Sequence, residues 1–239
     1  PATDDSNEEQ NDQTADSPLS DNPFERFSSA DIFDSPDKLR DFYTPDDIKH
    51  RDGEISKLVS KLGPALENNR PGHALLVGPN GSGKTVVSKW ISQKFLEMAG
   101  DRDADTVHVN CGSIETEYKM LARIINTITP ASEPNVGRGY SVDDLLLKAC
   151  NEIETLGDTV LLVLDEVGAI PDMNKFLYQM TRPKQDGTYL DDTNVAIIFT
   201  GNQLKFAENL SGANESKFDG SEIIFNPYNA DELRDILNH

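Results

Sequence analysis

The stretch GPNGSGKT, residues 78–85, is the most informative part of this sequence. It has the spacing G-x-x-x-x-G-K-T, set by Gly78, Gly83, Lys84 and Thr85. Glycines let the backbone approach an anion closely, and the N–H groups of such a loop attract phosphate together with the helix N-terminus that follows. The Lys84 ammonium group would neutralise the β- and γ-phosphates, and the Thr85 hydroxyl would bind Mg²⁺. The stretch therefore predicts a nucleotide-binding loop.

The elements on either side of the loop fit this interpretation. The apolar run HALLV (73–77) predicts a buried strand, and residues 84–98 place apolar side chains at helical spacing. A strand before the loop and a helix after it are the setting that the motif requires. We expect nucleotide contacts from the whole loop, namely Gly78, Pro79, Asn80, Gly81, Ser82, Gly83, Lys84 and Thr85.

A second motif, LLVLDE (161–166), brings two carboxylates to the end of an apolar strand. Open α/β sheets bind ligands at the carboxyl ends of their strands, so Asp165 and Glu166 are expected near the loop. Asp165 would hold Mg²⁺, and Glu166 would polarise the water that attacks the γ-phosphate. The alternative for this pair is an acidic cap on the next helix.

A third motif, NVAIIFTGN (194–202), ends another apolar strand with Asn202. The Asn202 side chain could position the attacking water beside the γ-phosphate. Because Gly201-Asn202 also suits a turn, a purely local role is the alternative.

Apolar strands alternate with helices along most of the chain. Besides 73–77, strands are expected at 106–110, 159–164, 194–199 and 222–225. Helices are expected at 52–68, with an interruption at Gly63-Pro64, and at 84–98, 116–128, 141–156, 172–181, 203–210 and 229–237. This alternation is typical of a parallel sheet covered on both faces, so the sequence predicts an α/β fold.

The chain is strongly acidic, with 42 Asp and Glu against 22 Lys and Arg and a formal net charge of -20. This charge predicts poor general affinity for DNA and for anionic membranes at low salt. No apolar run approaches the roughly 20 residues of a membrane-spanning helix. Acids dispersed through the folded part fit a halophile with molar salt in its cytosol, where the Debye length is about 3 Å. An ordinary acidic protein is the alternative.

Cysteine usage and the N-terminal segment bear on compartment and domain limits. Cys111 and Cys150 have no pairing motif, so we expect buried, reduced thiols and a cytoplasmic location. Residues 1–31 form an acidic tail that we expect to be disordered, since residues 1–22 contain seven acids and no Lys or Arg. This tail is either a solvated spacer or an acidic docking segment.

Taken together, the loop at 78–85, the Asp165–Glu166 pair and Asn202 resemble the core of AAA+ ATPases. The stretches YTPDDIKHRDGEI (43–55), VNCGSIETEYKMLARII (109–125) and IIFNPYNADELRDIL (223–237) resemble archaeal replication initiators related to the eukaryotic Orc and Cdc6 proteins, and the haloarchaeal members best. The resemblance implies an AAA+ P-loop NTPase core over residues 32–239. It also implies a five-stranded parallel sheet in the order 5-1-4-3-2 and the cofactors ATP or ADP and Mg²⁺.

The resemblance also implies roles for residues outside the loop. Ile48, His50 and Arg51 match the segment that lies against the adenine, although Arg51 could instead form a surface ion pair. The region after VNC matches an inserted helical element that touches DNA. Its basic residues between 112 and 140 are few, so a solvated helix is the alternative. They are Lys119, Arg123 and Arg138.

The sequence departs from the family pattern at two places. The family carries an arginine after the strand-borne Asn that reaches a neighbouring subunit's nucleotide, and Ala213 falls at that position. Such an arginine contributes roughly 10³–10⁵ to phosphoryl-transfer rates. The family continues with a helical lid and a winged-helix DNA-binding domain, and we expect neither here because the chain ends at His239.

The expected function is therefore that of an ATP-binding module in a DNA replication initiator, acting as a slow switch with weak ATPase activity in origin recognition and helicase loading. Expected partners are the nucleotide and other initiator subunits or a replicative helicase, with weak DNA contact and no membrane. Two alternatives stay open. One is a hydrolysis-deficient paralogue that binds nucleotide for structure and protein contacts, and the other is an AAA+ helper ATPase of a mobile element.

Overall fold

The computed structural model of the chain describes residues 43–67, 69–130, 136, 139–168, 170, 172–181, 190, 193–203, 205–208, 210, 212, 214–218 and 220–238. The acidic tail predicted for residues 1–31 lies outside the described residues, so its disorder and the domain limit at residue 32 stay predictions. Ala213 also lies outside them. Among the helices that the structure does describe, none is long and apolar enough to cross a membrane.

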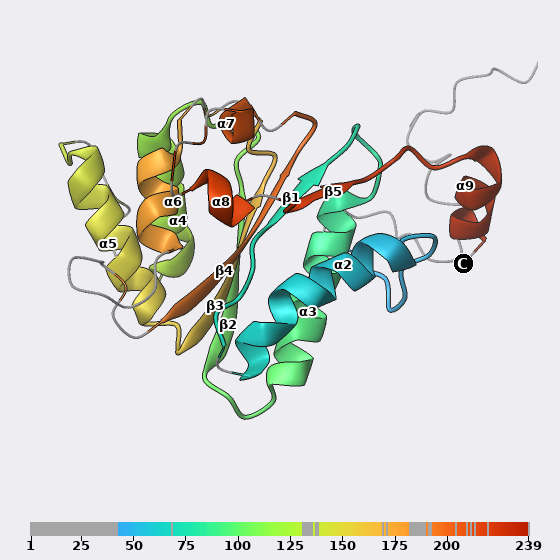
Figure 1. Cartoon of the computed structure of the whole chain (residues 1–239), viewed down its shortest axis with the longest axis horizontal. Helices are drawn as coiled ribbons and strands as arrows, with labels where there is room; N and C mark the ends of the chain where they lie inside the picture. Colours follow the sequence, from blue (N-terminus) through green and yellow to red (C-terminus); the bar gives the residue numbers. More distant parts are fainter. Residues whose placement is uncertain are drawn as a thin grey trace, which may run out of the picture. The chain divides into compact units, whose positions relative to one another are not determined.

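A parallel sheet of five strands forms the centre of the described part (Figure 1). The strands are β1 (Ala74–Val77), β2 (Ala104–Asn110), β3 (Thr159–Asp165), β4 (Asn194–Gly201) and β5 (Glu222–Ile224). They lie in the order β2-β3-β4-β1-β5, and every neighbouring pair is parallel. This is the order 5-1-4-3-2 counted from the other edge, so the predicted α/β class and strand order are confirmed.

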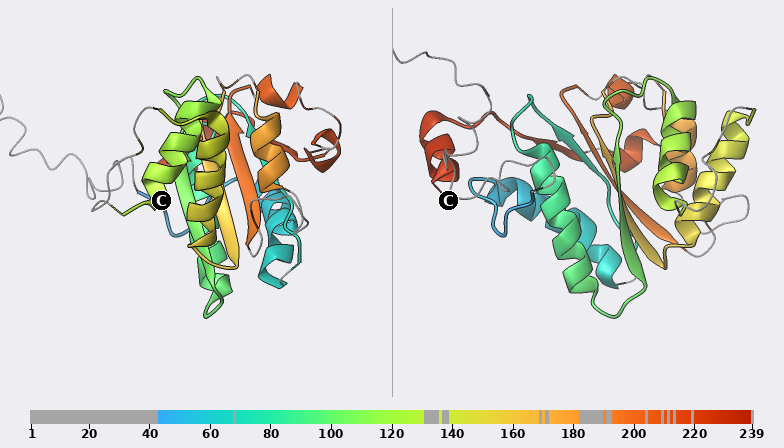
Figure 2. Two further views of the ribbon diagram at one scale, coloured as in Figure 1. Left: turned by 90° about the vertical axis from the view of Figure 1, so that its left-hand side faces the viewer. Right: turned by 180° about the vertical axis from the view of Figure 1, so that it is seen from behind.

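Helices cover both faces of the sheet (Figures 1 and 2). One face carries α2 (Asp52–Leu62) and α3 (Lys84–Ala99), and the other carries α4 (Glu117–Ile128), α5 (Val142–Glu154) and α6 (Asn174–Met180). After α2 the chain continues as a 3₁₀ helix, Gly63–Glu67, which confirms the interruption predicted at Gly63-Pro64. The remaining helices are α7 (Lys205–Glu208), α8 (Glu215–Phe218) and α9 (Ala230–Leu237).

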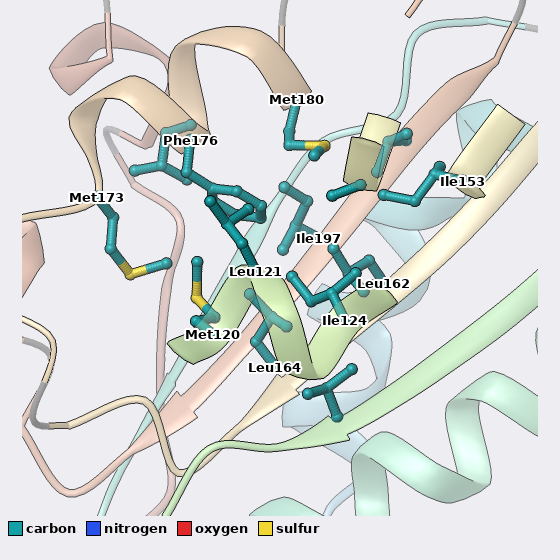
Figure 3. Packing of buried hydrophobic residues seen from close by; sticks show 14 of the residues in the cluster. Met120, Leu121, Ile124, Ile153, Leu162, Leu164, Met173, Phe176, Met180 and Ile197 are labelled. Carbon is teal, nitrogen blue, oxygen red and sulfur yellow. The ribbon is translucent and has the colours of Figure 1, made fainter. Parts of the chain in front are cut away.

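Strand β3 shows how the sequence fixes the centre of the sheet. All of its residues are buried, and its side chains alternate between two apolar clusters. Leu162 and Leu164 pack with α4, α5 and α6 (Figure 3), whereas Leu161 and Val163 pack with α2 and α3. Successive side chains of a strand point to opposite faces, so an uninterrupted apolar run needs cover on both. The same strand delivers Asp165 to the carboxyl edge of the sheet.

Candidate nucleotide-binding site

The loop at 78–85 joins β1 to α3 and borders a cleft of about 1020 Å³ at the carboxyl ends of the strands. Every residue of the loop except Ser82 lines this cleft. Glu166, which follows β3, and Asn202, which follows β4, also line it. The structure therefore brings together the three motifs that the sequence predicts to act together. A second cavity, of about 140 Å³, lies beside Ala104 at the amino end of β2.

Two glycines of the loop are required by the backbone around them. Gly83 has a φ of 92°, in the left-handed region, and a Cβ atom there would lie 2.7 Å from the hydroxyl of Tyr228. A Cβ atom at Gly78 would clash with the carbonyl oxygen of Phe225. Only glycine avoids both problems. The segment 225–228 thus packs directly against the first and the third glycine of the loop.

The Lys84 side chain is held within the loop and is 8% exposed. Its ammonium group donates hydrogen bonds to the carbonyl oxygens of Gly78, at 2.7 Å, and Pro79, at 2.8 Å. Burial lowers the pKa of Lys84, while the nearby carboxylates of Asp165 and Glu166 act in the opposite direction. The Lys84 amino group thus lies at the cleft beside two carboxylates, in a chain whose formal charge is -20.

The Asp165 carboxylate links the loop to β4 and is 2% exposed. The Thr85 hydroxyl donates to Oδ1 of Asp165 at 3.2 Å, and the Thr200 hydroxyl donates to the same oxygen. The register pairs Leu164 with Phe199, so Thr200 follows on β4 where Asp165 follows on β3. Sequence reasoning missed Thr200, whose only signal is its place two residues before Asn202.

Glu166 leaves β3 in an unusual backbone conformation, with a φ of 62°. Its N–H group donates to the Thr200 hydroxyl at 3.0 Å, and its exposed carboxylate lies close to Gly112 after β2. Left-handed backbone at a residue other than glycine costs of order 1–3 kcal/mol, and it persists where surrounding contacts fix it. Thr200 therefore helps to orient both acidic residues of the motif.

Ser82 and the three residues predicted to contact the base do not line the cleft. Ile48 packs in the apolar cluster with α2 and α3, and Nε2 of His50 lies 2.8 Å from Oδ2 of Asp235. Arg51 does form the ion pair given as the alternative, with Glu54, but the pair is not on the surface, because Arg51 is 5% exposed. Contact between these residues and an adenine stays a prediction.

The comparison with protein families defines the class of this protein. The AAA domain family (AAA_22) matches residues 67–210, which is more than half of the chain. The chain therefore belongs to this family, as the loop, the Asp165–Glu166 pair and the sheet order indicate. The AAA+ resemblance seen in the sequence is confirmed.

Its relatives identify the branch more closely. ORC1-type DNA replication protein 8 of Haloarcula marismortui is 35% identical over 228 residues, which are 92% of this chain and 51% of that protein. The Aeropyrum pernix ORC1 protein, solved in complex with DNA, matches with a TM-score of 0.68 and 30% identity over 84% of this chain and 51% of that one. The resemblance to archaeal Orc/Cdc6 proteins, haloarchaeal ones included, is confirmed.

A further structure supports the fold alone. Cdc6p from Pyrobaculum aerophilum matches with a TM-score of 0.66 and 24% identity, over 83% of this chain and 51% of that one. In each of these comparisons the chain spans about half the length of the relative that it matches. What the whole relatives do thus concerns more protein than this chain contains.

Proposed function

We propose that this chain binds Mg·ATP and hydrolyses it slowly, as the nucleotide switch of an archaeal replication initiator. The observation that carries the proposal is that Lys84 and Thr85 line one cleft and that the buried Asp165 carboxylate lies directly beside Thr85, with the two side-chain oxygens 3.2 Å apart. A cation and a pair of oxygen ligands at a phosphate-binding loop are what a metal-bound triphosphate needs.

The residues divide the chemistry between them. The N–H groups of the loop and the Lys84 ammonium group bind the phosphate oxygens. The Thr85 hydroxyl and the Asp165 carboxylate fit Mg²⁺, a hard cation that prefers oxygen ligands and keeps several waters. When bound, Mg²⁺ neutralises charge that develops on the β- and γ-phosphates.

Hydrolysis is assigned to Glu166 and Asn202, which also line the cleft. Glu166 accepts a hydrogen bond from a water, and Asn202 holds that water in line with the γ-phosphorus. The water oxygen forms a bond to phosphorus as the bond to the bridging oxygen breaks, the proton that the water loses passes through Glu166 to solvent, and ADP and inorganic phosphate result. Both side chains border the cleft, which supports this assignment.

The role in replication follows from the relatives and is part of the proposal. They are named as ORC1-type DNA replication proteins, and the Aeropyrum pernix ORC1 protein has been solved with DNA. We infer a part in origin recognition and helicase loading, with other initiator subunits or a replicative helicase as partners. Because the net charge is -20, DNA binding by this chain alone should be weak and salt-sensitive.

A hydrolysis-deficient paralogue is the second candidate. It is favoured by Ala213, which stands where the family has the arginine that reaches a neighbouring nucleotide. Such a protein would bind nucleotide for stability and act through protein contacts, with Glu166 in place but with little turnover.

Phosphate release from Mg·ATP in molar KCl distinguishes the two candidates. The proteins are wild type, Glu166→Gln and Lys84→Ala, with the exposed Lys57→Ala as a matched control. We expect slow phosphate release by wild type and by Lys57→Ala. In Glu166→Gln, release should fall by about 10²–10⁴-fold or to background while ATP binding is kept. In Lys84→Ala, both ATP binding and phosphate release should be lost. Equal background release by wild type and Glu166→Gln, with ATP bound by both, would favour the paralogue. Absence of ATP binding by wild type would overturn both candidates.

A further inference from the structure

Arg51 is a buried cation that donates four hydrogen bonds to other residues of the chain. Its Nε and Nη2 atoms donate to the carbonyl oxygen of Ser82 at 3.2 and 2.9 Å, and Nη2 also donates to the carbonyl oxygen of Asn226 at 2.6 Å. Nη1 donates to Oε1 of Glu54 at 3.1 Å. A buried charge is tolerated when it is paired and hydrogen-bonded. These contacts tie the start of α2 to the nucleotide loop and to the segment after β5.

The same guanidinium group lies over the face of an aromatic ring, that of Tyr228. Cζ of Arg51 lies 3.9 Å from the ring centroid of Tyr228 and 5.4 Å from that of Phe225. The Tyr228 hydroxyl also lies against Gly83, where a Cβ atom would be 2.7 Å away. Arginine stacks on aromatic rings through its planar, delocalised charge. Tyr228 thus contacts both the cation and the loop that the cation binds.

The contacts with Arg51 fix the orientation of the peptide bond between Ser82 and Gly83. In a planar trans peptide the C=O and N–H groups point to opposite sides. Because Arg51 holds the Ser82 carbonyl on its own side, the Gly83 N–H group points away from Arg51. Ser82 does not line the cleft and Gly83 does, so this N–H group lies on the side where phosphate would bind. Gly81 and Gly83, with φ values of 76° and 92°, leave the peptide flexible without such a restraint.

We propose that Arg51 and Tyr228 form a clamp that orients the nucleotide loop, so that Arg51 is a positioning residue and does not contact the base. Lysine cannot replace it, because an ammonium group lacks the planar fork that reaches two carbonyl oxygens and stacks on a ring. The clamp rests on the proposed function only for its effect on nucleotide affinity. Its effect on the loop itself is independent of any nucleotide.

Titration calorimetry in molar KCl tests the effect on affinity, with Mg·ATP, Mg·GTP and tripolyphosphate as probes. The variant is Arg51→Lys, and the exposed Arg234→Lys is the matched control. We expect Arg51→Lys to weaken all three ligands by the same factor of about ten, which leaves the ratio of ATP to GTP affinity unchanged. A changed ratio with unaltered tripolyphosphate affinity would mean a contact to the base and would overturn the clamp.

Tyr228 supplies a second pair of variants in case Arg51→Lys folds poorly. Tyr228→Leu removes the ring, whereas Tyr228→Phe keeps it and removes only the hydroxyl. If the ring holds the guanidinium group, Tyr228→Leu weakens Mg·ATP and tripolyphosphate binding more than Tyr228→Phe does. Equal affinities in the two variants would contradict the clamp.

Amide hydrogen exchange without nucleotide separates the clamp from the proposed function. We expect peptides that cover 78–85 to exchange faster in Arg51→Lys and Tyr228→Leu than in wild type, while peptides from 194–201 stay unchanged. Exchange of the loop at the wild-type rate in both variants would overturn the clamp. Wild-type protein that binds no nucleotide would overturn the proposed function, and the exchange rates would still decide on the clamp.

Discussion

The hydroxyl of Thr200 on β4 donates a hydrogen bond to Oδ1 of Asp165 at the end of β3. It also accepts one from the N–H group of Glu166, at 3.0 Å. One side chain therefore supports both the residue proposed to hold Mg²⁺ and the residue proposed to polarise water. Support of this kind keeps reacting groups in place, because one hydrogen bond restricts rotation of the Asp165 carboxylate and the other fixes the backbone that carries the Glu166 side chain.

Removal of the Thr200 hydroxyl should affect both stability and turnover. In Thr200→Val the N–H group of Glu166 and the buried carboxylate of Asp165 each lose a hydrogen-bond partner, which should lower the free energy of unfolding by about 1–3 kcal/mol. Phosphate release should fall as well. Thr193→Val is the control, since Thr193 donates a partly buried hydrogen bond to the carbonyl oxygen of Gly157 at 2.8 Å, away from the cleft. Urea unfolding and phosphate release measure the two effects, and equal release by the two variants would contradict the support role.

Substitution of Gly78 should be far more damaging than substitution of a glycine in open surroundings. A Cβ atom at Gly78 would clash with the Phe225 carbonyl oxygen, so the backbone must shift, at a cost of about 1–3 kcal/mol in Gly78→Ala. Gly53 lies within α2 and has nothing within 4 Å of a Cβ, so Gly53→Ala should stabilise by about 0.4–1 kcal/mol. Urea unfolding of both variants is the measurement, and equal midpoints would show that segment 225–228 does not press on the loop.

The stability of the protein should fall as the pH drops, in part because of His108 on β2. Burial lowers the pKa of His108 below its ordinary value of 6.5; the charge of Asp165 acts in the opposite direction and that of Lys89 in the same one. The unfolded chain then binds a proton that the folded protein rejects, so stability is lost as the pH falls through 6.5 toward the folded pKa. His108→Gln should reduce this loss. The measurement is the unfolding midpoint at pH 7 and at pH 5.5. An equal decrease of the midpoint between these pH values in wild type and in His108→Gln would contradict the role of His108.

The two thiols should be unreactive in the folded protein. Cys111 and Cys150 are free and buried, and burial raises the pKa of each thiol to about 12. Because the thiolate is the reactive form, Ellman's reagent at pH 8 should label neither cysteine until denaturant is added, when both react. Cys111→Ser serves as the calibration with one thiol. Rapid labelling of the native protein would show that one of these sites opens to solvent.

The strands could be predicted because the sheet is covered on both faces. The run TVLLVL (159–164) shows no alternation of apolar and polar residues. A short, continuous apolar run of this kind is typical of a strand that is buried on both faces. The sequence does not predict the start of β2 at Ala104, which lies two residues before the predicted start. Ala104 and Asp105 join the strand because they pair with Thr159 and Val160, and their own side chains carry no apolar pattern. The sheet order came from the family resemblance, since periodicity does not say which strands are neighbours.

The sequence does not predict helix α8 or the partners of Arg51, because both depend on contacts between distant parts of the chain. Helix α8 has four residues and is anchored by Phe218, whose ring stacks on His73 with centroids 5.3 Å apart. Arg51 reaches Ser82 and Asn226, which are 31 and 175 residues away in sequence. No local pattern records such partners. The motifs around the loop were found because their spacing is fixed by the phosphate chemistry itself.

The claim on which the other proposals depend is that the loop and Lys84 bind a magnesium-bound triphosphate within an otherwise acidic protein. Titration calorimetry with Mg·ATP in molar KCl, on wild type, Lys84→Ala and Lys57→Ala, measures this. We expect equal affinities for wild type and Lys57→Ala, and an affinity lower by at least about tenfold in Lys84→Ala, because the ammonium group no longer meets the phosphates. Equal affinity in wild type and Lys84→Ala would contradict the assignment of this loop as the nucleotide site.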